Sequence, residues 1–327
     1  MKVFVIGSGS WGTALANVLT DNGSEVTIYG RNINVVNEIN QQHTNSKYFD
    51  CKINESIKAT NDITECRDYD AVLLSVPSRE CLNIIHSIKP YLKENVIIIN
   101  VAKGFEPSSH RLLSDCITER LDHKCRYAAL LGPSHAEEVV VRKHTTVNIC
   151  CEDEETSKLL QKAFSNEYFR AYRNSDLVGC QYGAGLKNII AIASGILYGL
   201  DLGDNAKASL MTRGLAEMSR LGVLMGGKKE TFMGLCGMGD LIVTCTSQYS
   251  RNWQAGYQIG KDNSACNFWK TNTKTVEGVD ACRIIKQVAD EKNVSMPITQ
   301  ELYKVLFEEK KPSDALNDLM TRSLKAE

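Results

Sequence analysis

The chain has 327 residues, of which 43% are hydrophobic and 24% charged, and its formal net charge at pH 7 is -1. This composition is typical of a folded globular protein of about two domains. Because positive and negative charges nearly balance, no overall field attracts nucleic acid or an anionic membrane, and any recognition of an anion must be local.

Twelve cysteines are spread along the sequence without a C-x-x-C pair. We therefore predict no metal site and no disulfide framework. The sequence starts directly with an apolar strand, and its longest apolar run, around 186–200, is shorter than the about 20 residues that a membrane span needs. We expect a protein without a signal peptide or a membrane span, located in the reducing cytoplasm.

The first half of the sequence alternates between apolar strands and helices, and the first predicted helix covers about 12–22. The predicted strands are 2–6, 25–30, 70–77, 96–104, 127–133, 145–150 and 168–172. Apolar strands separated by helices are typical of a mostly parallel sheet covered on both faces. We predict a Rossmann-type α/β domain over residues 1–176.

From about residue 176 the runs of β-branched residues stop and helical patterns take over. The predicted helices are 176–200, 205–226, 230–236, 250–261, 277–293 and 298–308. We predict an all-α domain over 177–327. The glycines and alanines of 183–199 would let other helices approach closely, so the first of these helices is expected at the centre of that domain.

The first strand leads into a glycine-rich turn, Gly7-x-Gly9-x-x-Gly12, that opens a helix. In this setting Gly7 permits a tight turn, Gly9 lets the backbone approach a pyrophosphate, and Gly12 lets the helix pack on the strand. The helix N-terminus adds N–H donors for the phosphates. The pattern indicates a dinucleotide site rather than a purely structural turn.

An acidic residue commonly ends the second strand of an NAD-binding domain, where it bonds the ribose hydroxyl. Tyr29, Gly30 and Arg31 occupy that position here. A guanidinium fits a 2′-phosphate, so the sequence favours NADP(H), whereas NAD(H) lacks its usual acidic contact. The alternative is that Arg31 is an ordinary solvated loop cation.

Two further segments follow predicted strands. Lys103 comes after one strand, and Gly132, Ser134 and Ala136 lie in the turn after the next. Ligands of open α/β sheets bind at the carboxyl ends of the strands. We expect a ligand at this edge, although Lys103 alone could be an exposed lysine.

In the second domain, Asp240 lies in a glycine-rich turn, and Ser250 is a candidate N-cap followed by Arg251 and Asn252. An arginine beside free helix N–H groups makes an anion site, which a small phosphorylated substrate would fit. The alternative is a capped helix with a surface arginine.

Lys187 is the one charged residue in the apolar segment 183–200. The side chain could lie on a wet helix face with its stem along the helix. We favour a functional amine, because desolvation by neighbours such as Gly183 and Ile190 would lower the pKa of Lys187 toward neutrality and let it donate or accept a proton.

Taken together, the sequence resembles the NAD(P)-dependent glycerol-3-phosphate dehydrogenases of bacteria over essentially its full length. The resemblance rests on the segments GSGSWGTALA, SVPS, NVAKGFE, GPSHAEEV, LKNIIAIASGI, GMGDLIVTCTS, SRN, VEGV, MPIT and LMTRSLKAE. It implies reversible reduction of dihydroxyacetone phosphate to sn-glycerol 3-phosphate with NADP(H) and/or NAD(H), which supplies the backbone of glycerophospholipids. It also implies a homodimer.

The resemblance implies roles for individual residues. Lys187 would be the proton donor or acceptor, with Asp240 holding its ammonium and Lys103 near the reacting oxygen. The substrate would be bound by Lys103, Gly132, Ser134, Lys187, Asp240, Ser250, Arg251 and Asn252. The cofactor would be contacted by Gly7, Gly9, Ser10, Trp11, Gly12, Arg31, Lys103, Ala136, Arg251, Thr275 and Glu277.

The sequence departs from the family pattern in three places: at His135, in the residues that precede Lys187, and in the loop 262–274. None of these departures removes a residue of the proposed site. Two other functions stay open: a dehydrogenase of the same architecture that acts on 3-hydroxy acids or sugar acids, and a non-catalytic NADP-sensing protein.

Overall fold

The computed structural model divides into two compact units, Met1–Leu177 and Val178–Glu327, and it describes residues 1–324. The sequence places the domain boundary between residues 176 and 177. Helix α7 begins at Leu177, so the last strand of the first unit passes directly into the first helix of the second.

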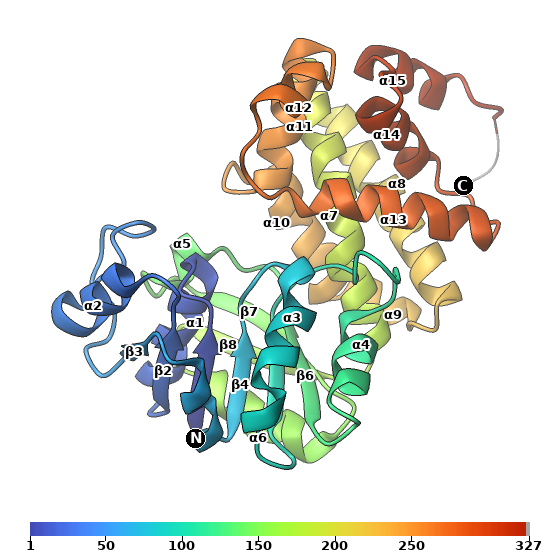
Figure 1. Cartoon of the computed structure of the whole chain (residues 1–327). Helices are drawn as coiled ribbons and strands as arrows, with labels where there is room; N and C mark the ends of the chain where they lie inside the picture. The colour runs from blue at the N-terminus through green and yellow to red at the C-terminus, as the bar shows by residue number, and fades with distance from the viewer. Residues whose placement is uncertain (325–327) are drawn as a thin grey trace. The chain divides into compact units, whose positions relative to one another are not determined.

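The first unit is built on one eight-stranded sheet with the strand order β3-β2-β1-β4-β5-β6-β7-β8 (Figure 1). The strands are β1 Lys2–Ile6, β2 Glu25–Tyr29, β3 Lys58–Thr60, β4 Ala71–Leu74, β5 Ile97–Asn100, β6 Arg126–Leu131, β7 Thr145–Cys150 and β8 Phe169–Asn174. Every neighbouring pair is parallel except β6 and β7. The predicted Rossmann-type, mostly parallel fold is confirmed, and its strand order reverses between β1 and β4.

Helices cover both faces of this sheet. They are α1 Ser10–Asp21, α2 Ile33–Gln42, α3 Ser78–Ile88, α4 Leu113–Arg120, α5 Ala136–Val139 and α6 Glu154–Phe164. Along β1, Val3 and Val5 join the apolar cluster that includes Leu15 of α1 and Phe164 of α6. Phe4 points to the opposite face and packs on Tyr69, with ring centroids 5.1 Å apart. Because both faces are buried, the strands read as continuous apolar runs.

The second unit is helical, as predicted. Its elements are α7 Leu177–Gly199, α8 Gly203–Leu224, α9 Lys229–Met233, the π-helix η3 Leu235–Gly239, α10 Asp240–Thr246, α11 Arg251–Asp262, α12 Cys266–Thr271, α13 Glu277–Glu291, α14 Pro297–Phe307 and α15 Pro312–Met320. Most residues of α7 are buried, and the helix runs through the interior of this unit (Figure 1). The segment 262–274, uncertain from the sequence, contains α12.

Glycines hold α7 and α11 in backbone contact. A Cβ atom on Gly195 of α7 would lie 2.1 Å from the carbonyl oxygen of Trp253, and one on Gly256 of α11 would lie 2.0 Å from that of Ile192. Each helix therefore needs glycine where it touches the other. The expectation that small residues make α7 the centre of its domain is confirmed.

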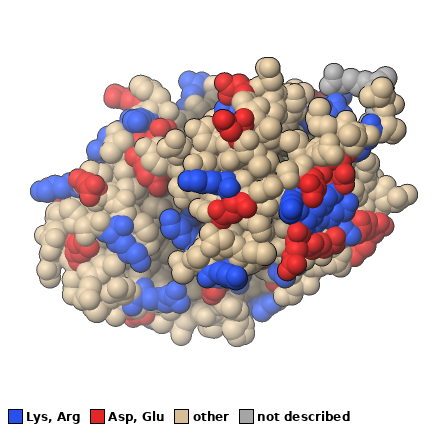
Figure 2. All heavy atoms as spheres, turned by 90° about the horizontal axis from the view of Figure 1, so that it is seen from above, with Lys and Arg blue, Asp and Glu red and all other residues tan. Residues whose placement is uncertain are grey.

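The surface carries mixed charge. On the face shown in Figure 2, basic and acidic side chains of the described residues are interspersed without a continuous basic stripe. Within residues 1–324, no helix combines the length and apolar character that a membrane crossing requires. All twelve cysteines carry free thiols.

A buried acid joins α8 to α14. Glu217 is 3% exposed and accepts hydrogen bonds from the backbone N–H groups of Ile298, at 2.7 Å, and Thr299, at 3.3 Å. Burial raises the pKa of Glu217 to about 7, an effect larger than the opposing one of these donors. The folded protein therefore holds a proton on Glu217 at pH values where the unfolded chain has lost it.

This difference predicts a pH dependence of stability. Between the ordinary pKa of about 4.5 and the raised one of about 7, the free energy of unfolding should fall as pH rises, by about 3 kcal/mol in all. Glu217→Gln, which cannot ionise, should flatten this slope in urea unfolding at pH 5 and pH 8. Parallel curves for the wild type and the variant would contradict the prediction, and the exposed Glu230→Gln is the matched control.

Candidate active site

The glycine-rich turn lies at the point where the strand order reverses. Gly7 has φ +118°, and a Cβ atom there would lie 2.3 Å from the carbonyl oxygen of Ser75 at the end of β4. A Cβ atom on Gly9 would meet nothing within 4 Å, so this stretch of backbone has an open face. Ser10 starts α1, and no side chain caps the helix. The turn thus presents open backbone and an uncapped helix N-terminus, the features that bind a pyrophosphate.

Arg31 follows β2 at the same edge of the sheet and is exposed. The next residue, Asn32, caps α2 by accepting the N–H of Asn34 at 2.9 Å. Arg31 is therefore held between a buried strand and a capped helix, beside the glycine-rich turn: a Cβ atom on Gly30 would lie 2.8 Å from the hydroxyl of Ser8. In dinucleotide-binding domains of this type, an arginine near the end of this strand can accommodate a ribose 2′-phosphate.

Lys103 and the turn after β6 lie together because β5 and β6 are parallel neighbours. The Lys103 amine donates to the carbonyl oxygen of Gly132 at 3.4 Å, and the Ser134 hydroxyl donates to the same oxygen at 3.1 Å. Ala136 begins α5 and is buried. Lys103, Gly132 and Ser134, all predicted at this edge, are thus neighbours in space.

The second unit holds a buried lysine. Lys187 is 3% exposed, and its Nζ donates to the Asp240 carboxylate at 2.5 Å and to the Thr244 hydroxyl at 2.6 Å. The Thr244 hydroxyl itself donates to the backbone carbonyl of Asp240 at 2.5 Å, so its lone pair faces the amine. These two contacts fix the direction of the Lys187 side chain.

The charge state of this amine is set by two opposed effects. Burial disfavours the ammonium, and the Asp240 carboxylate favours it. The expected lowering of the Lys187 pKa considered burial but not this carboxylate. The expected position of Asp240 against the amine agrees with the direct contact in the structure. Burial raises the pKa of the nearby Cys245 thiol to about 12, which disfavours the thiolate that a nucleophile needs.

Asp240 reaches Lys187 through a change in helix type. We predicted Asp240 in a glycine-rich turn, but residues Leu235–Gly239 form a π-helical turn and Asp240 is the first residue of α10. A Cβ atom on Gly183 of α7 would lie 2.4 Å from the carbonyl oxygen of Cys236. The π-helical turn therefore packs backbone to backbone on α7, one helical turn before Lys187.

The start of α11 is tied to α7 and α13. Ser250 is the N-cap as predicted, and its hydroxyl accepts the N–H of Trp253 at 3.2 Å. Asn252 donates to the Asn188 side chain at 3.0 Å and accepts the backbone N–H of Gly278 at 2.9 Å. Asn252 is thus a buried bridge between the helix that carries Lys187 and the first turn of α13.

Three residues to which the family resemblance gives a role, Arg251, Thr275 and Glu277, lie near Asn252 in the sequence or at the start of α13. Arg251 is exposed and lines a hollow of about 210 Å³ together with the segment that precedes α13. Thr275 and Glu277 are half-buried at the start of α13. The structure therefore gathers Arg251, Asn252, Thr275 and Glu277 at the N-termini of two helices.

Two further residues of this region, Thr244 and Asn188, were not predicted from the sequence. Thr244 lies four residues after Asp240 on α10, so the i, i+4 spacing of a helix could have indicated it. Asn188 follows Lys187, and its buried Nδ2 has no hydrogen-bond partner among residues 1–324. A buried amide nitrogen without a partner is costly and suits a ligand oxygen.

Comparisons with known proteins agree with this arrangement. Residues 2–157 match the family model of the N-terminus of NAD-dependent glycerol-3-phosphate dehydrogenase, and residues 176–317 match that of its C-terminus. The chain belongs to this dehydrogenase family. A glycerol-3-phosphate dehydrogenase (NAD(P)+) of Exiguobacterium is 49% identical over 330 residues, covering 100% of this chain and 97% of the relative. One of Staphylococcus saprophyticus is 46% identical, covering 100% and 99%.

A solved structure supports the same assignment. Glycerol-3-phosphate dehydrogenase from Coxiella burnetii superposes with a TM-score of 0.91 at 33% identity, covering 98% of this chain and 99% of that one. The family explains why the chain combines a dinucleotide-type turn with a buried lysine on a helical unit.

The bridge at Asn252 predicts a sensitive position. A Cβ atom on Gly278 would lie 2.5 Å from the carbonyl oxygen of Asn188, so Gly278→Ala must displace the start of α13. We expect a loss of about 1–3 kcal/mol in the free energy of unfolding, measured with urea. Gly234→Ala is the control, because its nearest contact would be an ordinary 3.4 Å. Equal stability of the two variants would show that α13 moves freely.

Proposed function

We propose that the chain catalyses the reversible reduction of dihydroxyacetone phosphate to sn-glycerol 3-phosphate with NADPH or NADH. The observation that carries this proposal is the Lys187 amine, buried and oriented by Asp240 and Thr244, in a chain of the glycerol-3-phosphate dehydrogenase family. Such an amine can stabilise an oxyanion and transfer a proton to it.

The chemistry has two parts. Bound NAD(P)H supplies the hydride that reaches the carbonyl carbon. As negative charge develops on the carbonyl oxygen, the Lys187 ammonium stabilises it and transfers one proton, which completes the alcohol. In the reverse direction the neutral amine takes the hydroxyl proton. Asp240 and Thr244 keep the amine in one direction, so little reorganisation accompanies the transfer.

The first unit suits the cofactor. The open backbone at Gly9 and the uncapped start of α1 at Ser10 and Trp11 would hold the pyrophosphate. Gly7 and Gly12 leave room for that turn, and Arg31 would bind the 2′-phosphate of NADPH. We assign Ala136 from this unit, and Arg251, Thr275 and Glu277 from the second unit, to further contacts with the cofactor.

We assign the substrate to polar groups of both units. From the first unit these are Lys103, Gly132 and Ser134. From the second unit they are Lys187, Asp240, Ser250, Arg251 and Asn252. The guanidinium of Arg251 and the first turn of α11 are the groups that best suit the phosphate, because both present N–H donors to an anion.

We also propose a homodimer that works in the cytoplasm. The resemblance to the family supports the dimer, and the reduced thiols and mixed surface charge suit the compartment. Analytical ultracentrifugation of the purified chain measures the first point directly.

Lys187→Met should lower kcat by about 10²- to 10⁴-fold, because it removes the proton donor. NADPH binding, followed by fluorescence titration, should stay nearly unchanged, because Lys187 is not among the residues that we assign to the cofactor. Lys292→Met, an exposed position in the same unit as Lys187, is the control. Wild-type turnover in Lys187→Met would refute the assignment.

Arg31→Ala should raise the KM for NADPH about ten- to a hundredfold and leave that for NADH nearly unchanged, because only NADPH carries the phosphate that a charge-assisted bond would hold. The two rates are compared at 340 nm with dihydroxyacetone phosphate. Arg67→Ala, at another exposed arginine of the first unit, should change neither. A parallel loss with both cofactors would mean that Arg31 does not read the phosphate.

Arg251→Ala should raise the KM for dihydroxyacetone phosphate at least about tenfold through loss of a charge-assisted bond. The kcat/KM for unphosphorylated dihydroxyacetone should change little. If both substrates suffer alike, Arg251 orients the reacting carbon rather than the phosphate.

A further inference from the structure

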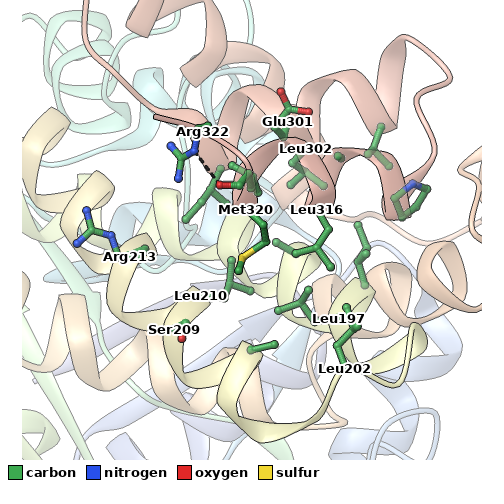
Figure 3. Close-up of a pocket in the computed structure, with 18 of the residues that line it drawn as sticks. Leu197, Leu202, Ser209, Leu210, Arg213, Glu301, Leu302, Leu316, Met320 and Arg322 are labelled. Carbon is green, nitrogen blue, oxygen red and sulfur yellow. Dashed lines mark hydrogen bonds between the residues drawn. The ribbon is translucent and has the colours of Figure 1, made fainter. Parts of the chain in front are cut away.

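A second hollow lies in the helical unit, lined by none of the residues that we assign to catalysis. It has a volume of about 470 Å³ and is bordered by the end of α7, the first half of α8, and the hairpin of α14 and α15. Figure 3 shows this groove. Its size lies within the range of small-molecule sites in proteins.

Small side chains leave this space open. Ala193 on α7, Ala206 and Ser209 on α8, and Ala315 on α15 form parts of the wall where larger residues would fill the gap. Larger apolar side chains, such as Leu302 and Ile298, form most of the rest. Most of the wall is therefore apolar, and water beside it gains few hydrogen bonds.

The polar groups of the groove are unevenly placed. Arg213 and Arg322 lie at one end, away from Leu197 and Leu202 (Figure 3). The Nε of Arg322 donates to the carbonyl of Leu319 at 3.0 Å, which fixes its guanidinium at the end of α15. The acid of the rim, Glu301, pairs with Lys304 and Lys310. The groove thus has a mainly apolar body and two arginines at one end.

We propose that this groove binds the anion of a single-chain fatty acid, with the carboxylate at the arginines and the alkyl chain along α8. From Leu202 to Arg213 the helix extends about 16 Å at 1.5 Å per residue. A carboxylate of roughly ten to twelve carbons spans this length at ordinary carbon–carbon bond lengths. The proposal goes beyond the dehydrogenase reaction and does not depend on it.

The test is calorimetric titration of the full chain with octanoate, decanoate and dodecanoate at pH 8, below their micelle concentrations. The dissociation constant should fall roughly three- to fourfold per added methylene, because each one buries more apolar surface. Dodecanol, which lacks the charge, and dodecyltrimethylammonium, which reverses it, should bind at least tenfold more weakly than dodecanoate. Equal binding of the three, or no heat with any of them, would overturn the proposal.

Matched variants locate the site. Ser209→Trp fills the groove from the exposed face of α8 and should weaken dodecanoate binding at least tenfold, whereas Ala208→Trp, one residue away and outside the groove, should not. Arg322→Gln should weaken dodecanoate but not dodecanol, with Arg283→Gln as the control arginine. The same loss in both tryptophan variants would refute the site.

Sedimentation of these proteins tests the alternative occupant of the groove, a second copy of the chain. If Ser209→Trp turns a dimer into a monomer and dodecanoate produces no heat with the wild type, the groove holds a second copy of the chain and the proposal fails. Because turnover of dihydroxyacetone phosphate is measured separately, this failure leaves the proposed dehydrogenase activity untouched.

Discussion

The organising constraint of the helical unit is a charged amine buried in its interior. A lone ammonium there would be very costly, so Lys187 requires the carboxylate of Asp240 and the hydroxyl of Thr244. Meeting that requirement needs a π-helical turn at Leu235–Gly239 and a glycine at position 183, where two backbones touch. The π-helical turn is thus the local geometry that accompanies the contact between Lys187 and Asp240.

Such a pair contributes little to stability, since desolvating both ions offsets most of their attraction. An apolar pair of similar volume would serve a purely structural purpose at least as well. The charged pair instead suits the chemistry proposed for this chain, because the burial that makes the pair costly would also strengthen its field on a reacting oxygen.

The parallel sheet, the glycine-rich turn and the helical second domain could be predicted from the sequence. They depend on local hydrophobic periodicity and on positions where only glycine fits. Of the helices between the strands, only the first was predicted with bounds. In α2, for example, the stretch INVVNEINQQ mixes asparagines with β-branched residues of low helix propensity. The π-helical setting of Asp240 was also missed, because that geometry comes from contact with α7 rather than from the residues of the turn. Ser250 was found since an N-cap is a local signal. Asn188 was not, because its partner Asn252 lies 64 residues away.

The glycine contact between α7 and α11 has a consequence for how this scaffold can diversify. An interface made of side chains can adapt to a substitution by repacking. Two helices in main-chain contact have no side chains between them that could repack. Lys187 lies on α7, and the first turn of α11 belongs to the other helix of this contact. Mutational drift can thus replace the groups displayed on them, yet it leaves their spacing unaltered, so new substrates must fit a fixed frame.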